Sequence, residues 1–134
     1  MTLKLPRAMV FEMIRHAIED LPNECCGIIL GKDGVATRFL RTRNAEPSPF
    51  RYNIHPEDLL QATREADEND WEFLVIYHSH VGSPAYPSQT DVRLAQWAGT
   101  DPPTDLYPGT YYVLVSLAEA TAPVVRAYQI TGGV

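Results

Sequence analysis

One short run of residues restricts the possible folds of this chain more than any other. Residues 73–77, Phe-Leu-Val-Ile-Tyr, are continuously apolar and combine aromatic with β-branched side chains. Such a run predicts a strand that is covered on both faces, at the centre of a sheet. The strand leads directly into His78-Ser79-His80, so polar side chains are expected at its carboxyl end.

Three stretches are predicted to form helices around this strand. Apolar residues recur at helical spacing over residues 6–21. At residues 56–58 a proline followed by two acids predicts the first turn of a second helix, which extends to about residue 69. Residues 91–98 also have helical character, and a proline-rich connection follows over residues 99–109.

Runs of β-branched and aromatic residues predict the remaining strands, at residues 25–30, 35–43, 50–54, 111–117 and 124–130. The first two are joined by the turn Gly31-Lys-Asp-Gly34, which favours a hairpin, and residues 50–54 are expected to form only a short edge strand. The main elements therefore follow the order helix, strand, strand, helix, strand, helix, strand, strand. This order predicts a mixed, mostly antiparallel β-sheet flanked by helices, an α/β or α+β sandwich.

Length and charge limit the function classes. The 134 residues fit a single domain that spans 1–134. No stretch approaches the roughly 18 consecutive apolar residues of a membrane helix, so no membrane association is expected. With 11 Lys and Arg residues, 17 Asp and Glu residues and no basic run, the formal charge of -6 argues against a nucleic-acid partner. Residues 1–7 lack the apolar core of a secretory signal, so we expect a cytoplasmic location.

The chain has 2 cysteines, Cys25 and Cys26, and they are adjacent. In a strand they would point to opposite faces, so they cannot easily form a disulfide with each other. The cysteines could be a thiol nucleophile or zinc ligands, but both interpretations are weaker than a role as small buried apolar residues. The H-x-E and P-C-x-x-C motifs of zinc nucleobase deaminases and the H-E-x-x-H motif of thermolysin-like enzymes do not occur.

His78 and His80 form a candidate metal site with Asp91. Residues two apart on an extended chain point to the same side, with Cα atoms about 6.6 Å apart, so two imidazoles can converge on one cation. Asp91 opens the next helix and could supply a third ligand, which leaves the fourth position of a zinc ion to water. The H-x-H pair alone is equally compatible with polar loop residues.

A second interpretation applies to the segment that contains Asp91. Ser88-Gln-Thr-Asp91 is typical of a capping box, in which Ser88 is the N-cap and Asp91 reaches back to it. An Asp91 turned towards a metal is not expected to reach the cap as well. The segment alone favours capping.

The motifs together resemble a known family. His78-Ser79-His80, seven residues, Ser88, two residues and Asp91 resemble the H-[ST]-H-x7-S-x2-D signature of the JAMM or MPN-plus zinc metallopeptidases. Upstream, Asn23-Glu24-Cys25-Cys26-Gly27 is similar to the E-x-C-G pattern of that family, and Glu24 is the matching acid. The resemblance extends through Asn44, Tyr77 and residues 52–54 and 112–116. Val81, where many relatives have proline, and the long connection at 99–109 depart from it.

The resemblance implies a JAMM/MPN, cytidine-deaminase-like architecture with one Zn2+ per chain held by His78, His80 and Asp91. It implies that Glu24 is the general base, although a Glu in this position would otherwise be interpreted as a surface acid. It also implies that Ser88 donates a hydrogen bond to the tetrahedral oxyanion. Ser79, which points away from the ligands, is expected to be structural.

Within the family the chain most resembles bacterial stand-alone members that act on the cysteine adduct of a ubiquitin-like sulfur-carrier protein, and Tyr86-Pro87-Ser88 adds to this likeness. The implied function is hydrolysis of the amide or isopeptide bond after the C-terminal glycine of such a carrier, with release of cysteine in cysteine biosynthesis. Two alternatives are a non-catalytic binding or scaffold module and a zinc hydrolase of another small amide. The intact ligand motif disfavours the first alternative.

The remaining polar residues receive structural interpretations. His16 and His55 have no partner at ligand spacing and are expected to be solvated or to cap helices. Residues 131–134 are expected to form a frayed tail, although they contain the pair Gly132-Gly133. Four arginines are expected to form a scattered solvated face rather than a site for an acidic partner: Arg38, Arg41, Arg43 and Arg51.

Overall fold

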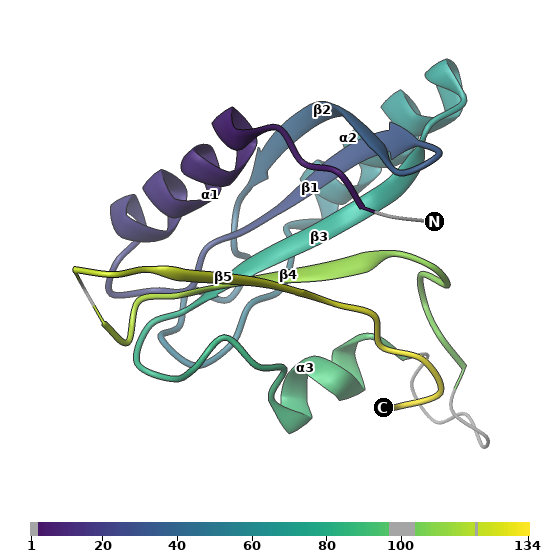
Figure 1. Cartoon of the computed structure of the whole chain (residues 1–134). Coiled ribbons are helices and arrows are strands. Elements are labelled where there is room, and N and C mark those ends of the chain that lie inside the picture. The colour runs from purple at the N-terminus through teal and green to yellow at the C-terminus, as the bar shows by residue number, and fades with distance from the viewer. Residues whose placement is uncertain (1–2, 97–103, 120) are drawn as a thin grey trace.

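The computed structural model describes residues 3–96, 104–119 and 121–134. The elements follow in the order α1 (Arg7–Glu19), β1 (Cys26–Lys32), β2 (Val35–Thr42), α2 (Pro56–Asn69), β3 (Glu72–His80), α3 (Gln89–Leu94), β4 (Tyr111–Ser116) and β5 (Val124–Tyr128). This is the element order that the sequence predicted, and Figure 1 shows a sheet flanked by helices. The predicted fold class is confirmed.

The sheet has five strands in the order β2-β1-β3-β4-β5. The pair β3–β4 is parallel, and the other three pairs are antiparallel, so the sheet is mixed and mostly antiparallel. β3 is the central strand, and its residues from Leu74 to His80 are buried, as the continuous apolar run predicted.

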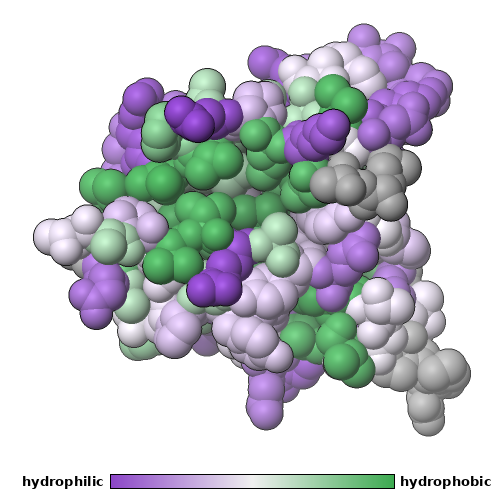
Figure 2. Space-filling view, viewed as in Figure 1, coloured by the Kyte–Doolittle hydropathy of each residue, from purple (hydrophilic) through white to green (hydrophobic). Residues whose placement is uncertain are grey.

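Helices cover both faces of the sheet, as Figure 1 shows. On one face, Met13 and Ala17 of α1 pack against Ile29, Val75 and other residues of the three central strands. On the other face, α2 contributes its buried alanines to a cluster with β1, and Ala95 at the end of α3 packs with residues of β3 and β4. On the α1 face, apolar side chains also gather at the surface (Figure 2).

Local sequence signals explain where several elements begin and end. The β1–β2 hairpin turns at Asp33 and Gly34, which both have positive φ (54° and 78°), as an Asp-Gly turn between twisted strands requires. His55 is the N-cap of α2 and accepts a hydrogen bond from the backbone N–H of Glu57, so its expected capping role is confirmed. Pro6 lies at the N-cap of α1, one residue before the helix.

Two sequence predictions need correction. Residues 50–54 do not form a strand, since only Ile54 makes an isolated bridge, to Asn44. The third helix begins at Gln89 and ends at Leu94, earlier than the predicted range of 91–98. Residues 97 and 98 of that range and residues 99–103 of the predicted connection lie outside the described residues.

The end of the chain is held by hydrogen bonds. Thr131 and Val134 exchange backbone hydrogen bonds, and the N–H of Gly132 donates to Asp105 Oδ1 at 3.0 Å. Residues 131–134 therefore form a turn rather than the frayed tail that the sequence suggested. Across the described ranges, no helix has the length and apolar character needed to span a membrane.

Candidate metal centre

The carboxyl end of β3 presents two histidines on one side of the sheet. The side chains of His78 and His80 project to the same face because they are two residues apart in a strand, and both are buried. Ser79 projects to the other face, where its Oγ accepts a hydrogen bond from the backbone N–H of Cys25 at 2.8 Å. This bond joins the end of β3 to the residue before β1.

Asp91 lies in the first turn of α3, and Ser88 is the N-cap of that helix. Ser88 Oγ accepts the backbone N–H of Asp91 at 3.0 Å, and Asp91 Oδ2 accepts the backbone N–H of Ser88 at 2.9 Å, so the capping box is complete. The same Oδ2 atom lies 3.1 Å from His78 Nε2 and 2.9 Å from His80 Nε2. The prediction that capping and facing the metal site exclude each other is wrong, because a carboxylate oxygen has two lone pairs.

The three side chains present atoms at a spacing that suits one metal ion. His78 Nε2 and His80 Nε2 are 3.2 Å apart, and both nitrogens lie close to Asp91 Oδ2. Tetrahedral ligands at about 2.0–2.1 Å from a zinc ion are about 3.3 Å from one another, so the observed separations fit zinc. Within the described part of the chain, no other group of three or more His, Cys, Asp or Glu side chains is placed to hold a metal.

Burial and mutual hydrogen bonds determine the protonation of this group. Burial lowers the pKa of His78 and outweighs the opposing effect of Asp91. Burial also acts to lower the pKa of His80, but its hydrogen bonds to Asp91 and Pro84 raise that pKa on balance. Burial acts to raise the pKa of Asp91, yet hydrogen bonds from both histidines hold it well below its usual value. At neutral pH the group therefore offers an anionic carboxylate and a neutral imidazole at His78.

The two histidine rings differ in their outer contacts. His80 Nδ1 lies 2.8 Å from the carbonyl oxygen of Pro84, which fixes the orientation of the ring. His78 Nδ1 is buried and has no hydrogen-bond partner among the described residues. Instead, the ring of Tyr52 stacks on the His78 ring, with centroids 4.3 Å apart and an interplanar angle of 21°. No local sequence signal predicted this contact, because it joins a loop residue to a distant strand.

Glu24 lies two residues before β1, at the end of the sheet that carries His78, His80 and Asp91. Its backbone N–H donates to the carbonyl oxygen of Ser48 at 2.7 Å, and its carbonyl oxygen accepts the side-chain amide of Asn44 at 3.1 Å. The residue is 4% exposed, and Oε1 has no partner among the described residues. The interpretation of Glu24 as a surface acid is therefore wrong.

Burial raises the pKa of Glu24 to about 8. The charge of His80 acts to lower this pKa, and the charge of Asp91 adds to its increase. The strand register agrees with these effects, because Cys26, two residues after Glu24, pairs with His78 in the sheet. Without a cation the carboxyl is mostly protonated at neutral pH, and a bound cation would favour its ionised form.

The two cysteines lie on opposite faces of the sheet, in different apolar clusters, as the sequence predicted. Both are free and buried, and burial raises the pKa of each thiol to about 12. Neither is a thiolate at neutral pH, so neither suits a nucleophilic role.

The prediction that His16 is solvated is wrong. The His16 side chain is buried, its Nδ1 lies 2.6 Å from the hydroxyl oxygen of Tyr77, and burial lowers its pKa. The sequence contained a signal for this position, because His16 lies three residues after Met13 on the buried face of α1.

The arginines at the β2 side of the molecule are paired with acids of the same chain. Arg41 contacts Glu12 and Glu19, and Arg38 contacts Glu65. Arg43 forms ion pairs with Glu57 and Asp58. These three arginines belong to surface ion pairs, whereas Arg51 forms no hydrogen bond or ion pair through its side chain within the described residues.

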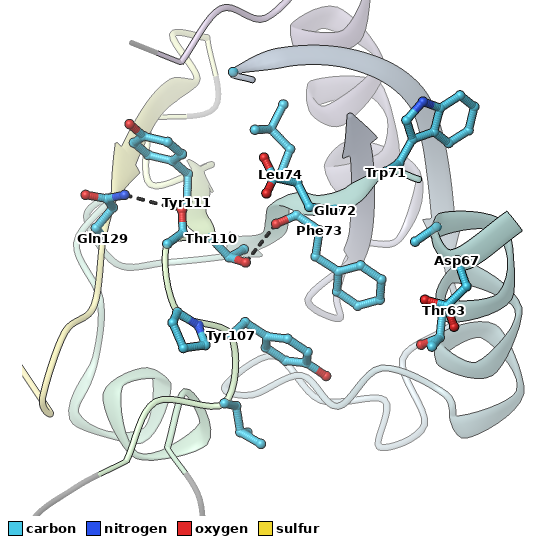
Figure 3. A pocket seen from close by; sticks show the side chains of 15 residues that line it. Thr63, Asp67, Trp71, Glu72, Phe73, Leu74, Tyr107, Thr110, Tyr111 and Gln129 are labelled. Carbon is cyan, nitrogen blue, oxygen red and sulfur yellow. Dashed lines mark hydrogen bonds between the residues drawn. The ribbon is translucent and has the colours of Figure 1, made fainter. Parts of the chain in front are cut away.

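A separate cavity of about 650 Å³ lies at the opposite end of β3 from the histidines. Figure 3 shows the stacked rings of Phe73 and Tyr107 facing Thr63 and Asp67 of α2 across this cavity. None of the residues predicted to act in chemistry lines it.

The chain is similar over most of its length to proteins of one family. The family model described as prokaryotic homologues of the JAB domain matches residues 6–131. The CysO-cysteine peptidase of Mycobacterium tuberculosis is 36% identical over 127 residues, which cover 93% of this chain and 80% of that protein. A probable TtuB-protein conjugate cleaving protease of Thermus thermophilus is 34% identical over 98 residues, which cover 72% of this chain and 66% of that protein.

Two solved structures are also similar to the chain. A solution structure of a protein from Desulfitobacterium hafniense matches with a TM-score of 0.73 and 32% identity, and the match covers 94% of this chain and 81% of that chain. A JAB1/MPN-domain protein from Archaeoglobus fulgidus matches with a TM-score of 0.56 and 14% identity over 97% of this chain and 92% of that chain. The second likeness concerns the fold alone.

Proposed function

We propose that this chain, which belongs to the family of prokaryotic homologues of the JAB domain, is a zinc-dependent peptidase within a single domain. The observation that carries the proposal is the buried group of His78, His80 and Asp91 beside the buried carboxyl of Glu24, whose Oε1 has no hydrogen-bond partner among the described residues. A binding module has no need for a buried acid with a free carboxyl oxygen beside a set of metal ligands. A hydrolase needs such an acid, because its proton acceptor must be free to meet water.

In this proposal His78, His80 and Asp91 hold one zinc ion. Zinc bound by three protein ligands supplies a Lewis acid that polarises a carbonyl group and lowers the pKa of a water molecule. The spacing of the three ligand atoms and the anionic state of Asp91 support the assignment. The Pro84 carbonyl orients His80 so that Nε2, the nitrogen that faces Asp91, is available as a ligand.

Glu24 is the proposed general base and acid. Its ionised carboxylate accepts a proton from the attacking water and later delivers that proton to the leaving amine. Within the described parts of the chain Oε1 has no hydrogen-bond partner, which leaves this oxygen free for both transfers. The backbone hydrogen bonds of Glu24 to Ser48 and Asn44 hold the residue in place on both sides.

Ser88 is the proposed hydrogen-bond donor to the substrate oxygen that gains negative charge. Its Oγ accepts the N–H of Asp91, so the hydroxyl proton is not used in the capping box and can point to a substrate. Ser88 is exposed, whereas Asp91 is buried. The serine therefore lies at the boundary between the ligand group and solvent.

The proposed substrate is a ubiquitin-like sulfur-carrier protein with cysteine attached to its C-terminal glycine. The names of the Mycobacterium tuberculosis and Thermus thermophilus relatives, a CysO-cysteine peptidase and a probable TtuB-protein conjugate cleaving protease, support this substrate class. A glycine-rich tail also suits a recessed site, because it has no side chains to collide with the walls. Release of cysteine from the carrier would follow.

The test uses three substrates with the purified full chain: a carrier–cysteine conjugate, a carrier–lysine conjugate and an unrelated peptide amide. Free amino acid and the intact mass of the carrier are followed by mass spectrometry. The proposal expects release of cysteine from the first substrate and an intact carrier. Cleavage of the peptide amide alone would favour the hydrolase of another small amide, and tight carrier binding without cleavage of any substrate would favour the scaffold alternative.

A further inference from the structure

The two histidines of the metal site are oriented by different means. The ring nitrogen of a metal-binding histidine that does not face the metal usually donates a hydrogen bond, which fixes the ring. His80 follows this rule through Pro84. His78 does not, because its Nδ1 is buried without a partner among the described residues. On its inner side the ring meets Asp91 through Nε2, so on its outer side a contact other than a hydrogen bond must hold it.

Tyr52 makes that contact. Its ring is nearly parallel to the His78 ring, with centroids 4.3 Å apart, and both side chains are buried. A flat ring at this separation blocks rotation of the imidazole about its Cβ–Cγ bond, since the rotating edge would enter the volume of the tyrosine. The stack can therefore keep His78 Nε2 directed at Asp91 and His80.

Tyr52 is itself held on both sides by Asn44. The side-chain amide of Asn44 donates to the carbonyl oxygen of Arg51 at 3.2 Å, and its Oδ1 accepts the backbone N–H of Asn53 at 3.0 Å. The same amide donates to the carbonyl oxygen of Glu24 at 3.1 Å. One side chain thus ties the loop that carries the stacking tyrosine to the backbone of the proposed general base.

We propose that Tyr52 is a positioning residue that orients His78 for metal binding through ring stacking, and that Asn44 anchors it. The inference rests on the zinc site of the proposed function. It predicts that a flat ring at position 52 matters and that the tyrosine hydroxyl does not. Leucine at this position fills most of the space but leaves the imidazole free to turn.

The experiment compares Tyr52→Leu, Tyr52→Phe and Tyr112→Leu in the full chain. Tyr112 is a matched control, because it is a buried tyrosine of the same apolar cluster and makes no ring contact with any histidine that the structure describes. Zinc affinity is measured by competition with a chromogenic chelator, and ligand geometry by the visible absorption spectrum of the Co2+-loaded protein. Thermal unfolding of the metal-free protein reports the general loss of packing.

We expect Tyr52→Leu to weaken zinc binding by about 10-fold or more, in the range found for residues that orient metal ligands, and to change the Co2+ spectrum. Tyr52→Phe should keep both properties near those of the parent. Tyr112→Leu should lower thermal stability without changing the spectrum. Asn44→Ala, which leaves the ring in place but removes its anchor, should weaken zinc binding by a smaller factor.

Equal loss of zinc affinity in Tyr52→Leu and Tyr112→Leu would show that packing alone is responsible and would overturn the inference. Unchanged affinity and spectrum in Tyr52→Leu would do the same, while the zinc site itself would stand if His78→Ala abolished binding. If Tyr52→Leu does not fold, the zinc affinities of Tyr52→Phe and Asn44→Ala decide. Weaker binding by Asn44→Ala than by Tyr52→Phe would support the inference, and equal affinities would overturn it. A parent protein that binds no zinc would instead contradict the proposed function.

Discussion

A single oxygen of Asp91 lies 2.9 Å from His80 Nε2 and also accepts the backbone N–H of Ser88, the N-cap of α3. The helix cap and the proposed metal site therefore share an atom. The cap fixes the side chain of Asp91 against the short helix, and this holds the carboxylate in place before any cation arrives. Preorganisation of this kind lowers the entropy lost on binding.

Asp91→Asn separates the two roles of that oxygen. An asparagine can still accept the N–H of Ser88, so we expect the free energy of unfolding of the metal-free protein to fall by only about 1–2 kcal/mol. Zinc binding should weaken about 100-fold or more, because the anionic ligand is lost. Metal analysis should find one zinc per parent chain and little in Asp91→Asn or His78→Ala, with His55→Ala as the control. Equal zinc content in all four proteins would remove these ligands from the site.

Glu24→Gln tests the proposed proton transfer. The amide has nearly the same shape but cannot accept a proton from water, so we expect zinc to remain bound and the rate of hydrolysis to fall by about 100-fold to 10,000-fold. Activity against the carrier–cysteine conjugate and zinc content are measured on the same preparation. A rate within about tenfold of the parent would exclude Glu24 as the general base.

The raised pKa of Glu24 also predicts a pH dependence of stability. Because burial raises this pKa from 4.5 to about 8, the folded metal-free chain keeps a proton that the unfolded chain releases. The unfolded state then binds fewer protons, so the free energy of unfolding should decrease as the pH rises from 4.5 to about 8. Denaturant titrations across this range should show a flatter profile for Glu24→Gln than for the parent. Parallel profiles for Glu24→Gln and the parent would contradict the raised pKa.

Ser88→Ala tests the proposed oxyanion donor. Loss of one such donor commonly lowers kcat by about 100-fold to 1,000-fold, whereas zinc binding depends on other side chains. Loss of the N-cap should also cost about 1 kcal/mol of stability. The replacement Ser88→Asn distinguishes the two effects, because asparagine is a good N-cap but places its donor differently. If Ser88→Asn restored full activity, the serine would act only through the helix cap.

The fold was predictable because its main elements have strong local signals. The apolar run that forms the core of β3 requires a central strand, and the proline and acids at the start of α2 fix its first turn. The loop at residues 50–54 was predicted wrongly, because the apolar Tyr52 and Ile54 alternate as in a strand. Their positions are instead determined by the side chain of Asn44, which no local rule reveals.

The proposed ligands could be found because the histidines, the serine and the aspartate lie at fixed spacing in the sequence. The environment of each residue could not be found in this way. Burial of Glu24 and the contact of His16 with Tyr77 depend on which strands become neighbours. The same holds for the Tyr52 stack, since tertiary structure brings a loop residue against β3.

The pairing of β1 with β3 leads to a last prediction, which concerns Gly27. Gly27 lies opposite Tyr77 in the sheet, and a Cβ atom at Gly27 would lie 2.1 Å from the Tyr77 ring. The ring is fully buried, and its hydroxyl contacts His16, so it cannot move aside freely. Gly27→Ala should therefore lower the free energy of unfolding by about 1–3 kcal/mol, the usual cost of overpacking a core.

Gly82→Ala is the matched control for this prediction, because a Cβ atom there would meet no described residue within 4 Å apart from its chain neighbours. If the clash with Tyr77 is the cause, Gly27→Ala should cost much less when Tyr77 is already replaced by leucine, and a double-mutant cycle measured by denaturant unfolding gives this coupling. Additive effects of Gly27→Ala and Tyr77→Leu would contradict the explanation. The free energy of zinc binding should change less than the free energy of unfolding. Although Tyr77 and His78 are adjacent in β3, their side chains point to opposite faces of the sheet.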